Sequence, residues 1–157
     1  MARFDKYLKT MLDGATNEAR LDGSTTVEAQ HLLLAIAADH GSAAGQLLAS
    51  ARLDRGAIRE ALDREFEHSL GAAGVATSAF GIPPATPDPQ HVPHPGASVR
   101  LALERGVTAA ARQDPRPAHL LIGILQAELG TVPRALALAG VDRADLMARA
   151  AGTLDVR

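Results

Sequence analysis

Histidines are the residues of this chain best suited to acid–base or metal chemistry, and two of the six occupy related positions. His31 begins the run HLLLAI, and His119 begins the run HLLIGI. Because both stand at the head of apolar runs, the pattern favours a packing or capping role for each. His91 and His94 lie in a proline-rich stretch with few carboxylates nearby, so they do not predict a metal site.

The sequence contains no motif that would make these histidines, or its few serines, catalytic. It has no cysteine, which excludes thiolate nucleophiles, disulfides and cysteine-ligated zinc. The patterns HExxH, GxSxG and GxxxxGK[ST] are also absent. We therefore expect no enzymatic activity, no metal and no cofactor.

An internal repeat positions the two histidine runs. They lie 88 residues apart (119 − 31), and the offset persists from residue 31 to residue 58. The same offset relates Leu48 to Leu136, Leu53 to Val141, Asp54 to Asp142 and Ile58 to Leu146. A constant offset of this kind predicts two copies of one helical unit, that is, an internal repeat.

Apolar periodicity predicts an all-α fold of eight helices, four in each unit and related by a pseudo-two-fold axis, with no strand. The helices are expected at about 5–21, 28–39, 43–51, 55–70, 97–112, 117–129, from 131, and from 142. The expected N-terminal caps are Asp5, a Thr25–Glu28 capping box, Ser42, Asp54, Thr131 and Asp142. Ile58, Leu62 and Phe66 are expected on one apolar face, and Val99, Leu103 and Val107 on another.

The expected organisation is a single domain over residues 1–157. Repeat one covers 4–70, a Pro/Gly-rich linker covers 71–96, and repeat two covers 97–152. The prolines of the linker prevent a helix there and favour an extended chain. It is either a mobile connection or a functional flap.

Composition narrows the classes of partner. The formal charge of −2 shows no basic excess for binding phosphates, and the apolar second helix of each unit is unlike a DNA-recognition helix. No apolar run approaches the ~20 residues that span a bilayer, and the N-terminus lacks a signal-peptide core. We therefore expect a cytoplasmic protein that binds neither nucleic acid nor membrane.

The repeat resembles the Clp N-terminal domain, the double-repeat module of AAA+ unfoldases such as ClpC and ClpA. Three blocks of repeat one carry the resemblance: an opening block from Phe4 to Ala19, residues 29–36 (AQHLLLAI), and Leu53, Asp54 and Ile58. In repeat two, residues 118–124 (AHLLIGI) and 140–142 (GVD) match the second and third blocks. Because the phosphate loop is missing, the resemblance suggests a free-standing domain without ATPase modules or an excised fragment, and we favour the first.

What the resemblance implies is a module that docks proteins or peptides. ClpC-type relatives recognise phosphorylated arginine through an acidic residue before each histidine, but this chain has Gln30 and Ala118 there, so phosphoarginine binding is not expected. Other relatives bind cyclic peptide antibiotics through an aromatic residue near the start of each repeat. Phe4 provides that residue in repeat one, whereas repeat two offers His94 or Gly96. The candidate binding residues are therefore Phe4, Lys6, Gln30, His94 and Ala118.

Three functions stay open at this point. The first is docking of adaptors, substrates or regulators of Clp-dependent proteolysis, including the unfoldase itself. The second is a decoy that captures a cyclic peptide aimed at the unfoldase. The third, a DNA-binding helical regulator, is disfavoured by the charge.

Overall fold

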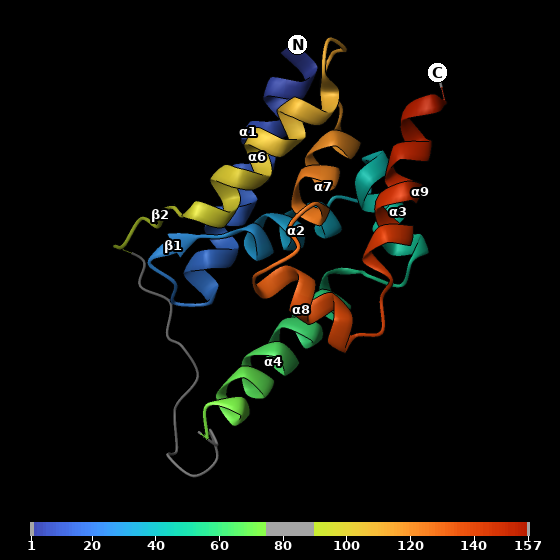
Figure 1. The fold of residues 1–157 in the computed structure, drawn as a ribbon. Helices are drawn as coiled ribbons and strands as arrows, with labels where there is room; N and C mark the ends of the chain where they lie inside the picture. Colours follow the sequence, from blue (N-terminus) through green and yellow to red (C-terminus); the bar gives the residue numbers. More distant parts are fainter. Residues whose placement is uncertain (1, 75–89, 157) are drawn as a thin grey trace.

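Eight α-helices and two very short strands make up the computed structural model, which describes residues 2–74 and 90–156 (Figure 1). The first half contains α1 (Ala2–Leu21), β1 (Thr26–Val27), α2 (Ala29–Ala38), α3 (Ala43–Ser50) and α4 (Arg55–Ala72). The second half contains β2 (His94–Pro95), α6 (Ala97–Ala110), α7 (Pro117–Leu125), α8 (Thr131–Leu138) and α9 (Arg143–Asp155). The prediction of an all-α fold with eight helices is confirmed.

Side-chain caps set where three of the helices begin. At α3, the Ser42 hydroxyl accepts a hydrogen bond from the Gly45 N–H at 3.1 Å. At α4, the Asp54 carboxylate accepts one from the Ala57 N–H at 2.8 Å, and Asp142 caps α9 in the same way. Each cap contributes about 1 kcal/mol to helix stability. These three predicted caps are confirmed.

The other predicted caps are wrong, each for a local reason. Helix α1 already begins at Ala2, so Asp5 lies inside its first turn, where the helix dipole favours a carboxylate. Helix α8 begins at Thr131 itself, and its N-cap is Gly130, whose φ of 114° is one that glycine adopts readily. At α2 the N-cap is Glu28 rather than Thr25.

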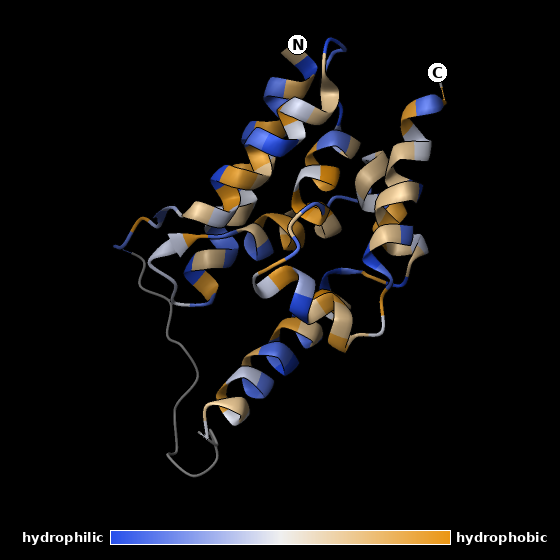
Figure 2. Cartoon of the chain, in the orientation of Figure 1, coloured by the Kyte–Doolittle hydropathy of each residue, from blue (hydrophilic) through white to orange (hydrophobic). Residues whose placement is uncertain are grey.

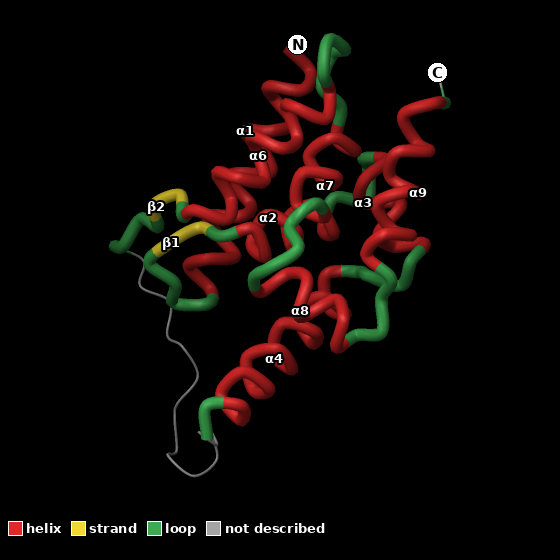
Figure 3. Tube along the Cα trace, in the orientation of Figure 1, coloured by secondary structure: helices red, strands yellow, loops and turns green. Residues whose placement is uncertain are grey.

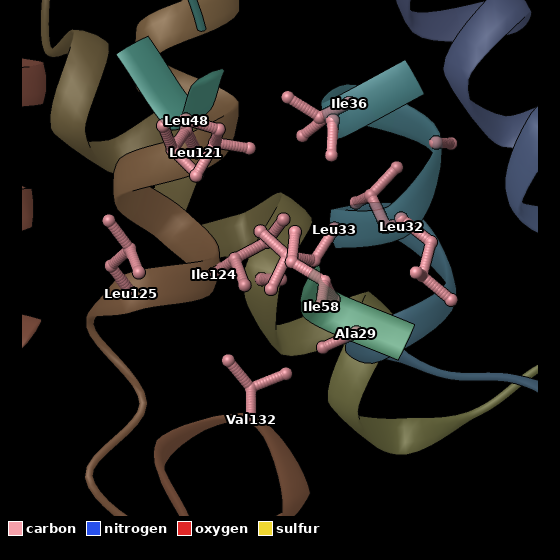
Figure 4. Packing of buried hydrophobic residues seen from close by; sticks show 14 of the residues in the cluster. Ala29, Leu32, Leu33, Ile36, Leu48, Ile58, Leu121, Ile124, Leu125 and Val132 are labelled. Atoms are coloured by element: carbon pink, nitrogen blue, oxygen red, sulfur yellow. The ribbon is translucent and has the colours of Figure 1, made fainter. Parts of the chain in front are cut away.

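The second helix of each repeat forms the centre of the core. In α2, the side chains of Leu32, Leu34 and Ile36 are completely buried, and α7 is buried to a similar degree. Figure 2 shows the contrast between the apolar α2 and the largely hydrophilic outer helix α4. Figure 4 shows that both repeats contribute to one cluster, which includes Leu33 of α2 and Ile124 of α7. Each buried leucine or isoleucine stabilises the fold by roughly 1.5–3 kcal/mol.

Two residues expected on apolar faces are exposed instead. Phe66 is 56% exposed because the last turns of α4 extend beyond the body of the domain (Figure 1). Val107 is 60% exposed because α6 turns Gly106 toward α7, where the two backbones approach closely. The second helix of repeat two also ends at Leu125, four residues earlier than expected.

The two repeats are interleaved. The third helix of each repeat packs on the fourth helix of the other, so α3 contacts α9 and α4 contacts α8. Polar contacts follow the same exchange: Arg149 of α9 donates to Ser50 of α3 at 2.9 Å, and Arg134 of α8 binds Glu65 of α4 at 2.9 Å. This reciprocity is the predicted pseudo-two-fold relation.

A parallel pairing of β1 with β2 was not expected from the sequence (Figure 3). Thr26 pairs with His94 and Val27 with Pro95, and the Gly96 N–H donates to the Val27 carbonyl at 2.9 Å. Strands of two residues are too short to show alternating hydrophobicity, so no pattern predicts them. Of the predicted linker 71–96, residues 75–89 lie outside the described residues.

Candidate functional site

A groove of about 570 Å³ lies where the two repeats meet, and we call it the α2/α6/α8 groove. It is formed by the start of α2, one face of α6, and the segment that runs from the end of α7 into α8. Its volume lies in the range of pockets that hold small ligands or short peptide segments. The described residues that line it and are discussed below are Glu28, Gln30, Ser98, Leu101, Ala102, Arg105, Ile124, Gln126, Glu128, Leu129, Val132 and Pro133.

The groove has an apolar floor and two exposed leucines at its edge. Ala102, Ile124 and Val132 lie on the floor and are at most 3% exposed. Leu101 of α6 is 45% exposed, and Leu129 in the loop before α8 is 90% exposed. Covering exposed leucines beside an apolar floor removes apolar surface from water and therefore favours binding of a partner. Such an arrangement is typical of a docking surface.

Polar side chains line the rest of the groove. Gln30 is partly buried near the start of α2, and Arg105 is partly buried on α6. Gln126 and Glu128 are exposed in the loop that follows α7. The groove therefore combines apolar contact with hydrogen-bonding groups at its rim, as peptide-binding grooves do.

The start of α2 is fastened to the start of α6 across the repeat boundary. The Glu28 carboxylate accepts hydrogen bonds from the Ser98 N–H at 3.2 Å and from the Ser98 hydroxyl. The Ser98 hydroxyl in turn accepts one from the Ala29 N–H at 2.8 Å. Gly96 leaves room for this carboxylate, because a Cβ at this position would lie 1.8 Å from Glu28 Oε1 and would force the Glu28 side chain to move. A carboxylate at the N-terminus of α6 is also favoured by the helix dipole.

The two symmetric histidines have structural roles, as their positions predicted. His31 and His119 are each 2% exposed. The Nδ1 atom of each accepts a hydrogen bond from the backbone N–H three residues before it, that of Glu28 or Arg116, at 2.9 Å. Burial, together with the positive charge of Arg116, lowers the pKa of His119, so its ring is neutral near pH 7.

An ionic cluster beside His31 joins α1, α2 and α4. Arg55 donates two hydrogen bonds to the buried Glu18, at 2.6 and 2.9 Å, and Arg59 bridges Glu18 and Asp22. Asp22 also receives the Nε2 hydrogen bond of His31 at 2.9 Å. Burial opposes ionisation of Asp22, but the His31 hydrogen bond and the charge of Arg59 outweigh it and lower the pKa of this carboxyl. Arg55 and Arg59 of α4 thus hold this helix against α1.

Among the five predicted site residues, only Gln30 lines the groove. Phe4 and Lys6 lie in the first turns of α1, and His94 is exposed in β2. Ala118 is 3% exposed and presents no side chain at the surface. The structure therefore brings only one of these five residues to the groove.

The burial pattern fixes the correspondence between α1 and α6. Met11, Ala15 and Ala19 of α1 match Ala102, Gly106 and Ala110 of α6, an offset of 91 residues (102 − 11). With this offset, the residue of repeat two that is equivalent to Phe4 is Pro95, which is not aromatic. Phe4 itself lies beside Tyr7, with ring centroids 6.3 Å apart.

The sequence did not single out Leu101, Arg105 or Leu129 as groove residues. Leu101 and Arg105 are four residues apart on α6, which is the one sequence signal that they share a face. The apolar pattern predicts Leu129 at the end of a helix, but it lies in the loop before α8.

In residues 2–74 and 90–156, no group of three or more His, Asp or Glu side chains could hold a metal ion. Within the same residues, no single helix has the length and apolarity to cross a membrane; one pair, α2 and α3, meets the criteria of length and composition, but it is bent by 91°.

Comparison with protein families matches residues 3–92 to the Clp repeat (R) N-terminal domain. No curated protein matches the chain.

Solved structures share the fold. The N-terminal domain of the caseinolytic protease associated chaperone ClpD from Arabidopsis thaliana superimposes with a TM-score of 0.64 at 23% identity, covering 92% of this chain and 90% of that one. The Hsp104 N-terminal domain from Candida albicans gives 0.62 at 14% identity, with 96% and 90% covered. A structure from an investigation of a malarial protein secretion system gives 0.60 at 16% identity, with 91% and 88% covered.

Proposed function

Because this chain belongs to the Clp repeat N-terminal domain family, we propose that it is a non-enzymatic module that binds peptide segments of other proteins in the α2/α6/α8 groove. The observation that carries this proposal is an apolar floor with two exposed leucines, Leu101 and Leu129, at its edge, where α2, α6 and the start of α8 meet. Burying a fully exposed leucine contributes about 1.5–3 kcal/mol, and Leu101, which is 45% exposed, can gain about half of that, so the two contacts support binding of a short segment.

The groove is well suited to a peptide because its walls are held in place. The Glu28–Ser98 hydrogen bonds fix α2 against α6, and the buried Val132 anchors the first turn of α8. A preformed groove loses little conformational freedom on binding, which favours affinity.

The experiment is a binding assay on the full chain with fluorescent peptides that are acetylated and amidated at their ends. Replacing Leu101 by Gln should weaken binding about tenfold, because a leucine contact is lost without any change of charge. Val107→Gln is the matched control, since Val107 is an exposed residue of the same helix outside the groove. Equal effects of the two substitutions would refute the groove as the binding site.

We propose that residues 1–157 form a single domain with repeats at 4–70 and 97–152. We also propose that the protein resides in the cytoplasm. We propose adaptors, substrates or regulators of Clp-dependent proteolysis as its partners, and family membership supports this assignment. A crosslinking pull-down from native lysate tests it. Recovery of a Clp unfoldase with the chain would support the regulatory role, whereas capture of a cyclic peptide without the unfoldase would support the decoy role instead.

A further inference from the structure

Arg105 is the cation of the α2/α6/α8 groove. Of the described residues that line the groove, Arg105 alone carries a positive charge. Its side chain is partly buried and has no hydrogen bond or ion pair within residues 2–74 and 90–156. An unpaired guanidinium at the wall of a groove is a ready partner for a carboxylate, which it can bind with two parallel hydrogen bonds.

The two acidic residues of the groove do not fill that role. The carboxylate of Glu28 is turned to the start of α6: one oxygen accepts both hydrogen bonds from Ser98, and the other lies against Gly96. Glu128 is exposed in the loop before α8 and makes no ion pair within the described chain. Arg105 therefore remains available to a ligand.

Two further features favour a negative group in the same space. Gln30 is neutral, and its amide can donate a hydrogen bond to a carboxylate. The N-cap Gly130 and the first residues of α8 also line the groove, so the positive end of the α8 dipole and the Arg105 guanidinium both favour a negative ligand in the same space.

We propose that the α2/α6/α8 groove selects peptide segments in which an Asp or Glu side chain stands next to an aliphatic residue, and that Arg105 is the residue that sets this selectivity. The carboxylate binds Arg105 while the aliphatic side chain covers Leu101 and Leu129. This inference rests on the proposed function and specifies the class of peptide that the groove accepts.

An acidic side chain fits better than a peptide C-terminus. A terminal carboxylate is usually captured by several free backbone N–H groups in a row. At the start of α2, the N–H groups of Glu28 and Ala29 already donate to His31 and Ser98, and the Ser98 N–H donates to Glu28. At the start of α8, Pro133 has no N–H to offer, so the row of free N–H groups is cut to those of Thr131 and Val132.

The test uses the full chain and three fluorescent peptides of one leucine-rich sequence, with Glu, Gln or Lys at the central position and both ends blocked. Anisotropy should show the Glu peptide binding about tenfold more tightly than the Gln peptide, and the Lys peptide binding most weakly. Arg105→Gln should bring the Glu and Gln peptides within about twofold of each other, and Arg105→Glu should reverse the order of Glu and Lys. Arg100→Gln, on an exposed site of α6 outside the groove, is the matched control and should keep the selectivity.

The possible failures are distinguishable. If the wild-type chain binds none of the three peptides, the proposed function fails and this inference fails with it. If all three bind equally and Leu101→Gln weakens all of them, the groove binds peptides but Arg105 does not select among them. A fourth peptide with a free C-terminus and a central Gln tests the other source of a carboxylate: tighter binding of this peptide than of the blocked Glu peptide would overturn the assignment to an acidic side chain.

Discussion

Tyr7 gives the most direct test of the packing around α1, because it is the single tyrosine of a chain without tryptophan. Burial raises the pKa of its phenol to about 12; the nearby Ser42 hydroxyl offsets part of this effect and the negative charge of Asp39 adds to it. In the unfolded chain the phenol should titrate near its ordinary pKa of 10.

The sign of the effect on stability follows from these two values. Below pH 10 the phenol is protonated in both states and makes no pH-dependent contribution. Between pH 10 and 12 it ionises in the unfolded chain but stays protonated in the folded one, so the free energy of unfolding falls. A shift of one pKa unit corresponds to ~1.4 kcal/mol, so the loss should reach about 2 kcal/mol by pH 12.

Two measurements check this prediction. The phenolate absorbance of the native chain should have its midpoint near pH 12, and that of the chain in denaturant near pH 10. Urea unfolding at pH 10 and pH 12 should show a larger loss of stability for the wild type than for Tyr7→Phe, since the two lysines titrate in both proteins and cancel in the comparison. A native midpoint near pH 10 with intact helical circular dichroism would refute the buried position of the Tyr7 hydroxyl.

Two further predictions concern the contacts that hold the groove and the ionic cluster. Gly96→Ala should destabilise the chain by about 1–2 kcal/mol in urea unfolding, because its Cβ would displace the Glu28 carboxylate from its hydrogen bonds with Ser98. Gly152→Ala is the control and should stabilise by about 0.5–1 kcal/mol, since this helical glycine has open space around it. Equal effects of the two substitutions would contradict the close approach. Because the pKa of Asp22 is lowered in the folded state, its stabilising contribution is complete above the unfolded pKa of about 4 and is lost as the pH falls through the lower folded value. Asp22→Asn should therefore lower stability at pH 7 and flatten the acid limb of the stability profile below about pH 4, and an unchanged acid limb would argue against the His31 and Arg59 contacts.

The fold was largely predictable because its determinants are local and repeated. The caps at Ser42, Asp54 and Asp142 follow from side chains that bond to the backbone three residues away, and such contacts are readable from sequence. The histidine runs were predictable as core helices because they are apolar nearly all round.

What could not be predicted depends on how distant elements meet. The exposure of Phe66 reflects the length by which α4 extends past its neighbours, and the sequence of α4 alone carries no information on that. Arg105 and Gln30 share a groove although they are 75 residues apart (105 − 30), because the crossing of α2 and α6 places them there. Gln30 was found because a family resemblance pointed to its position, and Arg105 had no such signal.

The exchange of third and fourth helices between the repeats has a consequence for how the chain unfolds. Because α3 packs on α9 and α4 on α8, neither repeat buries all of its apolar surface within its own residues. A repeat on its own would expose much of the shared cluster to water, so partial unfolding of one half removes the support of the other. The domain should therefore unfold in a single cooperative thermal transition, and a destabilising substitution in either repeat should lower the stability of both.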